Sequence, residues 1–465
     1  MSIEVLSRMQ FAFTAMFHYI FPPFSIGLGL LLVIFESIYI WTKDPLYEKI
    51  TKFWIKIFAA NFSLGVATGI VLEFEFGTNW SRYSRFVGDV FGSPLAAEGI
   101  FAFFLESGFL AILLFGWDRV KPRVHWFSTL MVALGSMMSA FWIIVANSWQ
   151  QTPVAYKIVQ ANGASRAVIT DFWQVVFNPS TMPRFLHAVV GSYIQGSFLV
   201  ISISAYYLLK NKHLEFAKKS IFIALTVAGL SSVIQPLIGH WHAVIVAEHQ
   251  PAKLAAFEGL FESRKYAPLS LVGWVDVKNE KSYVLSIPSG LSLLLSGKSD
   301  HYVKGLKDFP KSDWPSINQV FQSYHLMVAL GMLFVLVSFI SLYWHYKKIL
   351  YQKRWLMKFY VFSVVLPVIA NQAGWFSAER GRQPWIVQGL LRTAEGFSPN
   401  LQSYEIIISL VLFALTYLLL LFSWIYILNK EIQHGPEHIH TIPSHDTEKK
   451  FLDAAIDLKK EKHGF

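Results

Sequence analysis

The sequence predicts an all-α integral membrane protein, a bundle of about nine transmembrane helices. Two features of the composition indicate this class: 54% of the 465 residues are hydrophobic, and only 15% are charged. The third indication is that apolar runs close to the ~20 residues needed to cross a bilayer recur along the chain. Together these features exclude a soluble globular protein.

Nine apolar runs define the expected spans. They cover residues 11–40, 53–75, 95–117, 124–147, 184–209, 217–237, 321–344, 356–376 and 404–428. The first run is too long for the apolar region of a cleavable signal peptide, and it contains His18 and Glu36. We therefore expect the first span to be retained in the membrane.

The distribution of basic residues predicts the orientation. Lys and Arg crowd the connections after the first, third, fifth and seventh spans, as the connections on the cytoplasmic side usually do. This places the N-terminus outside, the C-terminus in the cytoplasm and the long 238–320 connection outside. Residues 1–428 then form the transmembrane domain, which includes that loop, and residues 429–465 form a cytoplasmic tail that we expect to be disordered. The net charge of +10 follows from this arrangement and does not indicate a nucleic-acid partner.

The absence of cysteine restricts the cofactors. Iron–sulfur clusters, c-type haem attachment and thiolate copper sites all need cysteine, so the sequence excludes them. Any metal or redox cofactor has to be held by His, Met, Glu, Asp or Tyr.

The segment 374–393, GWFSAERGRQPWIVQGLLRT, places Glu379 and three arginines directly after an apolar span. Ionisable groups at such a depth cost roughly 2.5–3.5 kcal/mol each on insertion scales, so they usually have a partner or a function. A solvated loop at the end of a helix is the alternative interpretation.

Possible metal ligands gather in one half of the predicted bilayer. On the topology above, the outer half receives His18, Glu98, His187, Met327 and Glu379. A shared buried site explains this convergence better than five separate packing roles. A His with a Met forms a six-coordinate haem pair, whereas a second His or a carboxylate leaves the opposite face of a haem open for oxygen.

Several long motifs resemble one known family. They are SRMQFAFTAMFHY (7–19), EFGTNWSRYS (75–84), SPLAAEGIFAFFLES (93–107), QPAKLAAFE (250–258), YHLMVALG (324–331) and GWFSAERGRQPW (374–385). The chain resembles subunit I of cytochrome bd quinol oxidases, of the type with a short quinol-binding loop, from about Leu6 to Phe397. The nine-helix subunit of that family agrees with the nine spans expected from hydropathy.

The resemblance implies a set of cofactors and their ligands. Residues 1–428 would bind two haems b together with either one haem d or a third haem b. His187 and Met327 would hold the low-spin haem b that receives electrons from quinol. His18 and Glu379 would hold the two high-spin haems, in an order that the sequence leaves open. Further residues expected in the haem environment are Asn147, His325, Trp375, Arg382 and Arg392.

His325 departs from the family pattern, which often has Arg at this position. A titratable imidazole would replace a fixed charge near a haem propionate. In the external loop, the resemblance assigns Lys253 and Glu258 to quinol binding, with the carboxylate accepting a quinol proton and the cation orienting the head group. A solvated loop helix is the alternative for these two residues.

Glu98 and Glu106 lie eight positions apart, which on an α-helix is about 12 Å of rise and roughly 80° of rotation. They are too distant to share a proton but suit successive stations in a proton path, with Ser107 and water between them. Glu98 could alternatively cap the start of its helix. Glu106 lies two turns deeper, where a capping role fails.

These features predict the haem-containing subunit of a respiratory oxidase in the bacterial cytoplasmic membrane. It would oxidise quinol at the outer face and reduce O2 to water, separating charge across the membrane without pumping. The resemblance implies a homologous subunit II as partner, and the family often has a small single-helix subunit as well. Two alternatives remain: a quinol-oxidising membrane cytochrome with another acceptor, and a proton-coupled secondary transporter.

Overall fold

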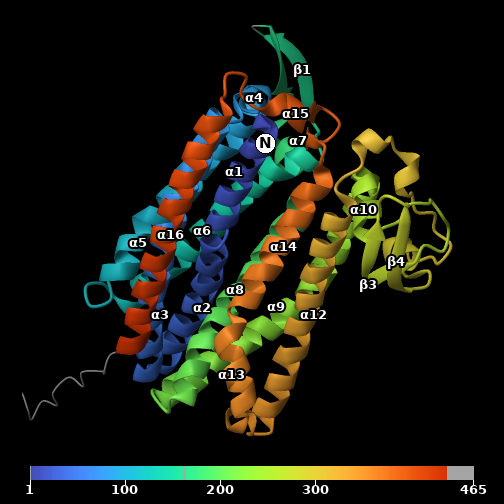
Figure 1. Cartoon of the computed structure of the whole chain (residues 1–465). Helices are drawn as coiled ribbons and strands as arrows, with labels where there is room; N and C mark the ends of the chain where they lie inside the picture. Colours follow the sequence, from blue (N-terminus) through green and yellow to red (C-terminus); the bar gives the residue numbers. More distant parts are fainter. Residues whose placement is uncertain (1, 162, 437–465) are drawn as a thin grey trace, which may run out of the picture.

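The computed structural model describes residues 2–161 and 163–436. Within these residues, eight helical stretches are long and apolar enough to cross a membrane, and a ninth is a helix pair bent by 42°. The predicted fold class, a bundle of about nine transmembrane helices, is therefore confirmed. They form one elongated bundle, in which α1, α4, α7 and α15 lie toward the same end (Figure 1).

The spans follow the predicted order. Their elements are α1 (Ile3–His18) with α2 (Phe21–Thr42), α3 (Pro45–Thr78), α4 (Ser81–Ala97) with η1 (Glu98–Phe103) and α5 (Phe104–Phe115), α6 (Pro122–Gln151), α8 (Thr181–Leu209), α9 (Leu214–His249), α12 (Ile317–Tyr346), α13 (Arg354–Ser363) with α14 (Val365–Arg382), and α16 (Ser403–His434). Helices suit this setting because every backbone N–H and C=O in the bilayer needs an internal partner.

Helix α8 lies at the centre of the bundle, with 89% of its most apolar window buried. It packs closely on α2 because both helices have glycine at the crossing. A Cβ atom on Gly27 would lie 2.8 Å from Cα of Gly196, so only the smallest residue fits. By contrast, only 11% of the corresponding window of α16 is buried.

In the part of the chain that the structure describes, three two-stranded antiparallel sheets lie outside the spans. They pair β1 (Tyr156–Ala161) with β2 (Ala164–Ile169), β3 (Leu269–Asp276) with β4 (Lys281–Ile287), and β5 (Trp385–Val387) with β6 (Leu391–Arg392). The short helices beside them are α7 (Phe172–Val176), α10 (Pro251–Glu258), α11 (Gly290–Ser296) and α15 (Thr393–Gly396), with 3-10 turns at η2 (Leu306–Asp308), η3 (Lys311–Asp313) and η4 (Leu350–Gln352). Helix α10, β3, β4 and α11 share a small apolar core with the start of α12.

Two predicted boundaries need correction. Helix α9 continues to His249, so the long connection begins at Gln250 and not at residue 238. Helix α16 continues to His434, six residues past the predicted end of the transmembrane domain. Both helices extend beyond their apolar run because the backbone stays helical after the hydropathy falls. The predicted tail beyond residue 436 lies outside the described residues.

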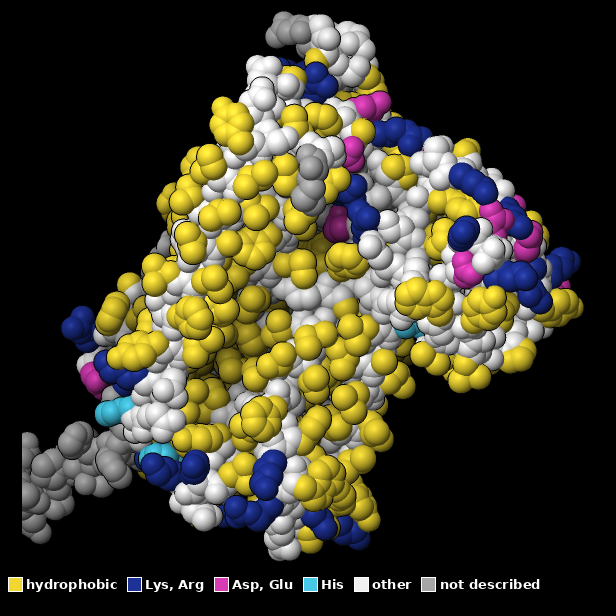
Figure 2. All heavy atoms as spheres, in the orientation of Figure 1, with side chains coloured by type: hydrophobic (Ala, Val, Ile, Leu, Met, Phe, Trp, Pro, Cys, Tyr) yellow, Lys and Arg dark blue, Asp and Glu magenta, His cyan; other side chains and the backbone are white. Residues whose placement is uncertain are grey.

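The surface in Figure 2 fits a membrane-spanning bundle. Apolar side chains cover the middle of the visible face, whereas Lys and Arg gather at one end and mixed charges gather on the loop domain that contains β3 and β4. This is the distribution that a bilayer imposes, because charged groups avoid the hydrocarbon core. The chain is a multi-pass membrane protein.

Candidate functional site

The last turns of α14 connect most of the predicted site residues. A Cβ on Gly374 would lie 2.8 Å from Sδ of Met327 on α12. One residue later, the ring of Trp375 lies 5.3 Å from that of Tyr19, next to His18. The helix ends at Arg382 because Pro384 follows, and the residue before a proline favours an extended backbone. Segment 374–382 thus contacts elements that are distant in the sequence.

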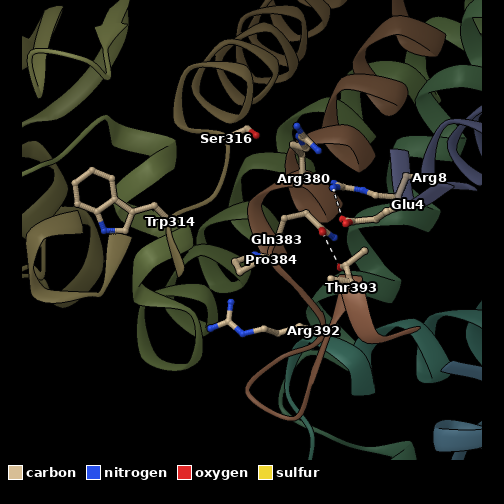
Figure 3. Close-up of a pocket in the computed structure, with 10 residues that line it drawn as sticks. Glu4, Arg8, Trp314, Ser316, Arg380, Gln383, Pro384, Arg392 and Thr393 are labelled. Atoms are coloured by element: carbon tan, nitrogen blue, oxygen red, sulfur yellow. Dashed lines mark hydrogen bonds and ion pairs between the residues drawn. The ribbon is translucent and has the colours of Figure 1, made fainter. Parts of the chain in front are cut away.

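One side of this segment borders a surface cavity of about 270 Å³ (Figure 3). Arg8, Arg380, Arg392 and Trp314 are among its lining residues. Arg392 forms an ion pair with Asp313 at 2.5 Å, and its guanidinium lies 4.5 Å from the ring centre of Trp385. Arg392 thus lies at the surface with a loop carboxylate as its partner, and its predicted place in the haem environment stays a prediction.

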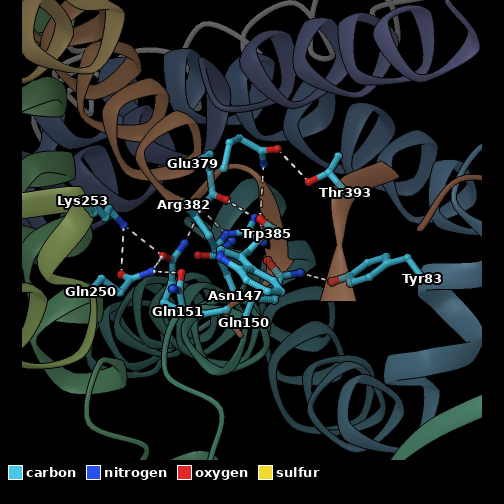
Figure 4. A network of polar contacts seen from close by, with 12 residues as sticks. Tyr83, Asn147, Gln150, Gln151, Gln250, Lys253, Glu379, Arg382, Trp385 and Thr393 are labelled. Atoms are coloured by element: carbon cyan, nitrogen blue, oxygen red, sulfur yellow. Dashed lines mark hydrogen bonds and ion pairs between the residues drawn. The ribbon is translucent and has the colours of Figure 1, made fainter. Parts of the chain in front are cut away.

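The other side of the segment presents Glu379 to a ring of donors (Figure 4). Asn147 and Gln151, one turn apart on α6, each donate a side-chain hydrogen bond of 3.2 Å to Oε1 of Glu379. Arg382 donates to the other oxygen, Oε2. Arg184 of α8 lies 3.6 Å from Oε1. The carboxylate is thus fixed by groups from three helices.

Arg184 is a site residue that the sequence reasoning missed. It is buried, its guanidinium lies 5.4 Å from the ring centre of Trp375, and it donates to the side-chain oxygen of Asn147. A signal was present, because an Arg three residues before the predicted ligand His187 is unusual inside an apolar span.

Three of the predicted haem ligands each lie against a glycine. Cβ atoms built on Gly69 and Gly239 would lie 3.2 Å from Cε1 of His18 and 3.5 Å from Cε1 of His187, respectively, in addition to the close approach of Gly374 to Met327. His18 also contacts Thr68, with 2.9 Å between Nδ1 and Oγ1. Glycine at these positions leaves room beside each ligand that a side chain would fill.

These features fit haem. Within the described residues, Nδ1 of His187 and Nε of both Arg184 and Arg382 are buried and have no hydrogen-bond partner. Unpaired buried polar atoms are costly, so these nitrogens indicate a further partner. Buried basic groups suit the propionates of a porphyrin, and the donor set of His, Met and carboxylate suits iron.

Lys253 of α10, in the long connection between α9 and α12, is buried next to this cluster. Its ammonium group donates to Oε1 of Gln151 at 2.9 Å and to Oε1 of Gln250 at 3.2 Å. Its aliphatic stem crosses α14 at Gly381, where a Cβ would lie 2.9 Å from Cγ of Lys253. Burial, together with the positive charge of Arg184, lowers the pKa of Lys253 well below its usual value.

Glu258 has different neighbours from Lys253. Its Oε2 accepts a hydrogen bond of 2.8 Å from the backbone N–H of Ser270 on β3, and burial raises its pKa to about 7. His325 of α12 meets the same strand, since Nε2 lies 3.0 Å from the carbonyl oxygen of Ser270, and Nδ1 lies 2.8 Å from that of Phe321. Both ring nitrogens of His325 therefore face backbone carbonyls of the loop and of its own helix.

Glu98 and Glu106 both face α6. Ser139 donates to Oε1 of Glu98 at 2.6 Å, and Ser136 donates to Oε1 of Glu106. The expected rotation between the two acids assumed a regular α-helix. Residues 98–103 instead form a π-helix, so the rotation between the Glu98 and Glu106 side chains differs from the expected value.

Ser107 is exposed, and its hydroxyl donates to the carbonyl oxygen of Phe103 at 2.7 Å. Its predicted place in the proton path stays a prediction. The hydroxyls that donate to the two acids come from α6, because helix packing and not sequence proximity decides which hydroxyl lies beside a buried acid.

Comparisons with known proteins identify the family of the whole chain. A family model described as cytochrome bd terminal oxidase subunit I matches residues 6–436. The chain is 40% identical to cytochrome bd ubiquinol oxidase subunit 1 of Bacillus subtilis (strain 168), covering 95% of this chain and 97% of that one. It is 35% identical to cytochrome bd-II ubiquinol oxidase subunit 1 of Escherichia coli (strain K12), covering 93% and 96%. Among solved structures it is similar to the bd oxidase from Geobacillus thermodenitrificans, with a TM-score of 0.87, 31% identity and coverage of 93% and 99%.

Proposed function

The chain belongs to the cytochrome bd terminal oxidase subunit I family, and we propose that it is the haem-carrying subunit of a quinol:oxygen oxidoreductase of the bacterial cytoplasmic membrane. The proposal is carried by one observation above all. Segment 374–382 contacts both the residues that suit haem and Lys253 of the external loop. The proposed haem ligands and the proposed quinol contact therefore belong to one buried cluster.

His187 and Met327 would hold a low-spin haem b, and His18 and Glu379 would each hold a high-spin haem, two of b type and one of d or b type in all. Bound haem supplies iron that accepts single electrons and, where one face is open, reduces oxygen. The protein holds the ligands in place: Thr68 orients the His18 ring, and Asn147, Gln151 and Arg382 orient the Glu379 carboxylate.

Quinol would bind at the loop on the outer side, near α10. Glu258 suits the role of proton acceptor because its pKa of about 7 lets it take and release a proton near neutral pH. Lys253, with its pKa lowered, would bind the quinol head group through an N–H that does not donate to Gln151 or Gln250.

Protons for water formation would come from the cytoplasm through Glu106 and Glu98, each paired with a serine of α6. A proton that crosses the whole membrane potential represents about 2.3 kcal/mol per 100 mV. Taking these protons from inside, while quinol protons leave outside, would generate proton motive force without pumping.

A homologous subunit II is the expected partner, with a small single-helix subunit as a possible addition. Helices α16 and α5 expose large apolar side chains along their length, and subunit II would cover part of this surface in place of lipid. Examples are Leu412, Leu419 and Phe422 on α16, and Phe104 and Phe115 on α5.

The test is haem extraction from the purified complex, with a reduced-minus-oxidised spectrum and quinol-dependent oxygen uptake. We expect three haems per copy of the chain, and loss of individual spectral components in His18→Ala, His187→Ala and Glu379→Gln. A colourless complex, or one whose spectrum is unaffected by all three substitutions, contradicts the proposal.

A further inference from the structure

A single glutamine connects the proposed quinol site to the proposed iron ligand Glu379. The side-chain oxygen Oε1 of Gln151 accepts hydrogen bonds of 2.9 Å from Lys253 Nζ and from Gln250 Nε2. Its side-chain nitrogen Nε2 donates to Oε1 of Glu379 at 3.2 Å. Gln151 is almost completely buried, at 1% exposure. Figure 4 shows these contacts in one network.

The orientation of this amide is fixed by the chemistry of its neighbours. Lys253 Nζ and Gln250 Nε2 are donors, so they need the oxygen of Gln151 beside them, and a carboxylate needs the nitrogen. A flipped amide would place its NH₂ group against two donors and its oxygen against Glu379. The amide therefore has only one favourable orientation. When Lys253 moves, the amide cannot compensate by flipping, so its hydrogen bond to Glu379 changes.

Other contacts hold both ends of the link in place. Gln250 Nε2 also donates to Gln388 Oε1 at 3.1 Å, and the backbone N–H of Gln388 donates to the carbonyl oxygen of Gln150 at 2.9 Å. The stem of Lys253 is held against Gly381. Hydrogen bonds in a buried polar network are coupled, so a displacement at the loop end of this link reaches Glu379.

Asn147 provides an internal comparison. It lies one turn before Gln151 on α6 and donates to the same oxygen of Glu379 at the same distance, 3.2 Å. Its other side-chain partner is Arg184 of α8, and not a residue of the external loop. The two amides therefore support Glu379 equally, but only Gln151 joins it to Lys253.

We propose that Gln151 is a positioning residue through which occupancy of the quinol site changes the environment of Glu379. This rests on the proposed function, since it takes Lys253 as a quinol contact and Glu379 as an iron ligand. A quinone head group that accepts a hydrogen bond from Lys253 competes with Gln151 for the N–H donors of the ammonium group. The hydrogen bond from Lys253 to Gln151 then changes. The bond that the Gln151 amide donates to Glu379 changes with it. Linkage requires the reverse effect as well: the state of the Glu379 iron changes the affinity for quinone by the same factor.

The test uses the whole oxidase complex in its oxidised form, titrated with a short-chain ubiquinone, which binds without donating electrons. Optical difference spectra report the haems, and equilibrium dialysis reports bound quinone. In the parent protein we expect a saturable spectral change that disappears in Glu379→Gln. In Gln151→Met, which keeps the side-chain length but removes both hydrogen-bonding functions, quinone still binds and the spectral change falls at least fivefold.

Asn147→Leu is the matched control, because it removes an equivalent donor to Glu379 and leaves the link intact. Its resting spectrum shifts, and its response to quinone remains. The steady-state effects of Gln151→Met and Lys253→Met on KM should also be non-additive, since both substitutions break the same link.

Three results overturn the inference: no response to quinone in the parent, a full response in Gln151→Met, or equal loss of the response in Asn147→Leu. Failure of the proposed function looks different. In that case Glu379→Gln leaves the haem spectrum of the complex unchanged before any quinone is added.

Discussion

Replacing Gly374 with alanine should displace the sulfur of Met327 and lower the potential of the low-spin haem. The added Cβ would lie 2.8 Å from Sδ of Met327. Ordinary contact is about 3.5–4.0 Å, so the sulfur has to move by roughly 1 Å. A thioether ligand raises the potential of haem iron, and a shift of this size removes or weakens that ligand.

The substitution should not unfold the bundle. Overpacking of this kind costs about 1–3 kcal/mol, and alanine in place of glycine within a helix returns roughly 1 kcal/mol. The clash falls on the flexible end of a methionine and not on backbone. The complex should therefore assemble with its haems, and the effect should be specific to the low-spin haem.

The assay is a spectroelectrochemical redox titration of the purified complex, with Gly331→Ala as the matched control. Gly331 lies one turn after Met327 on α12, and a Cβ there meets nothing within 4 Å among the described residues. The control should keep the parent potential. An unchanged potential in a fully assembled Gly374→Ala complex would refute the placement of Met327 at the iron.

Three further predictions follow from the same contacts. Because burial raises the pKa of Glu258 to about 7 and the proton acceptor works when deprotonated, kcat/KM for quinol should rise as pH rises through about 7 and fall below it. Glu258→Gln should remove this limb of the pH profile, and an unaltered profile would exclude Glu258 as the acceptor. Glu106→Gln should slow reoxidation by oxygen at least tenfold in stopped-flow measurements, on the scale typical for a lost proton-transfer group. Ser136→Ala should slow it less and the exposed Ser107→Ala not at all, whereas equal effects of the two serines would contradict the path along α6. Arg392→Gln should leave every haem spectrum unchanged, because its partner is a surface carboxylate, and a spectral shift would return Arg392 to the haem environment.

The sequence by itself determined the class, the number and order of the spans, and the family. Crossing a bilayer depends on the summed hydropathy of about 20 consecutive residues, which is a local property of the chain. The same local character explains why the motif around Glu379 could be identified without coordinates. The ends of α9 and α16 were less accessible, because a helix can continue after its apolar run stops.

Only the tertiary structure decided which side chains meet. Ser136 and not Ser107 lies beside Glu106, Arg392 pairs with Asp313, and Gln151 reaches both Lys253 and Glu379. Each of these contacts joins residues that are far apart in the sequence, and each depends on how the helices and loops pack against one another. Spacing along one helix gives the direction of its own side chains, but it does not give the neighbour that packs against them.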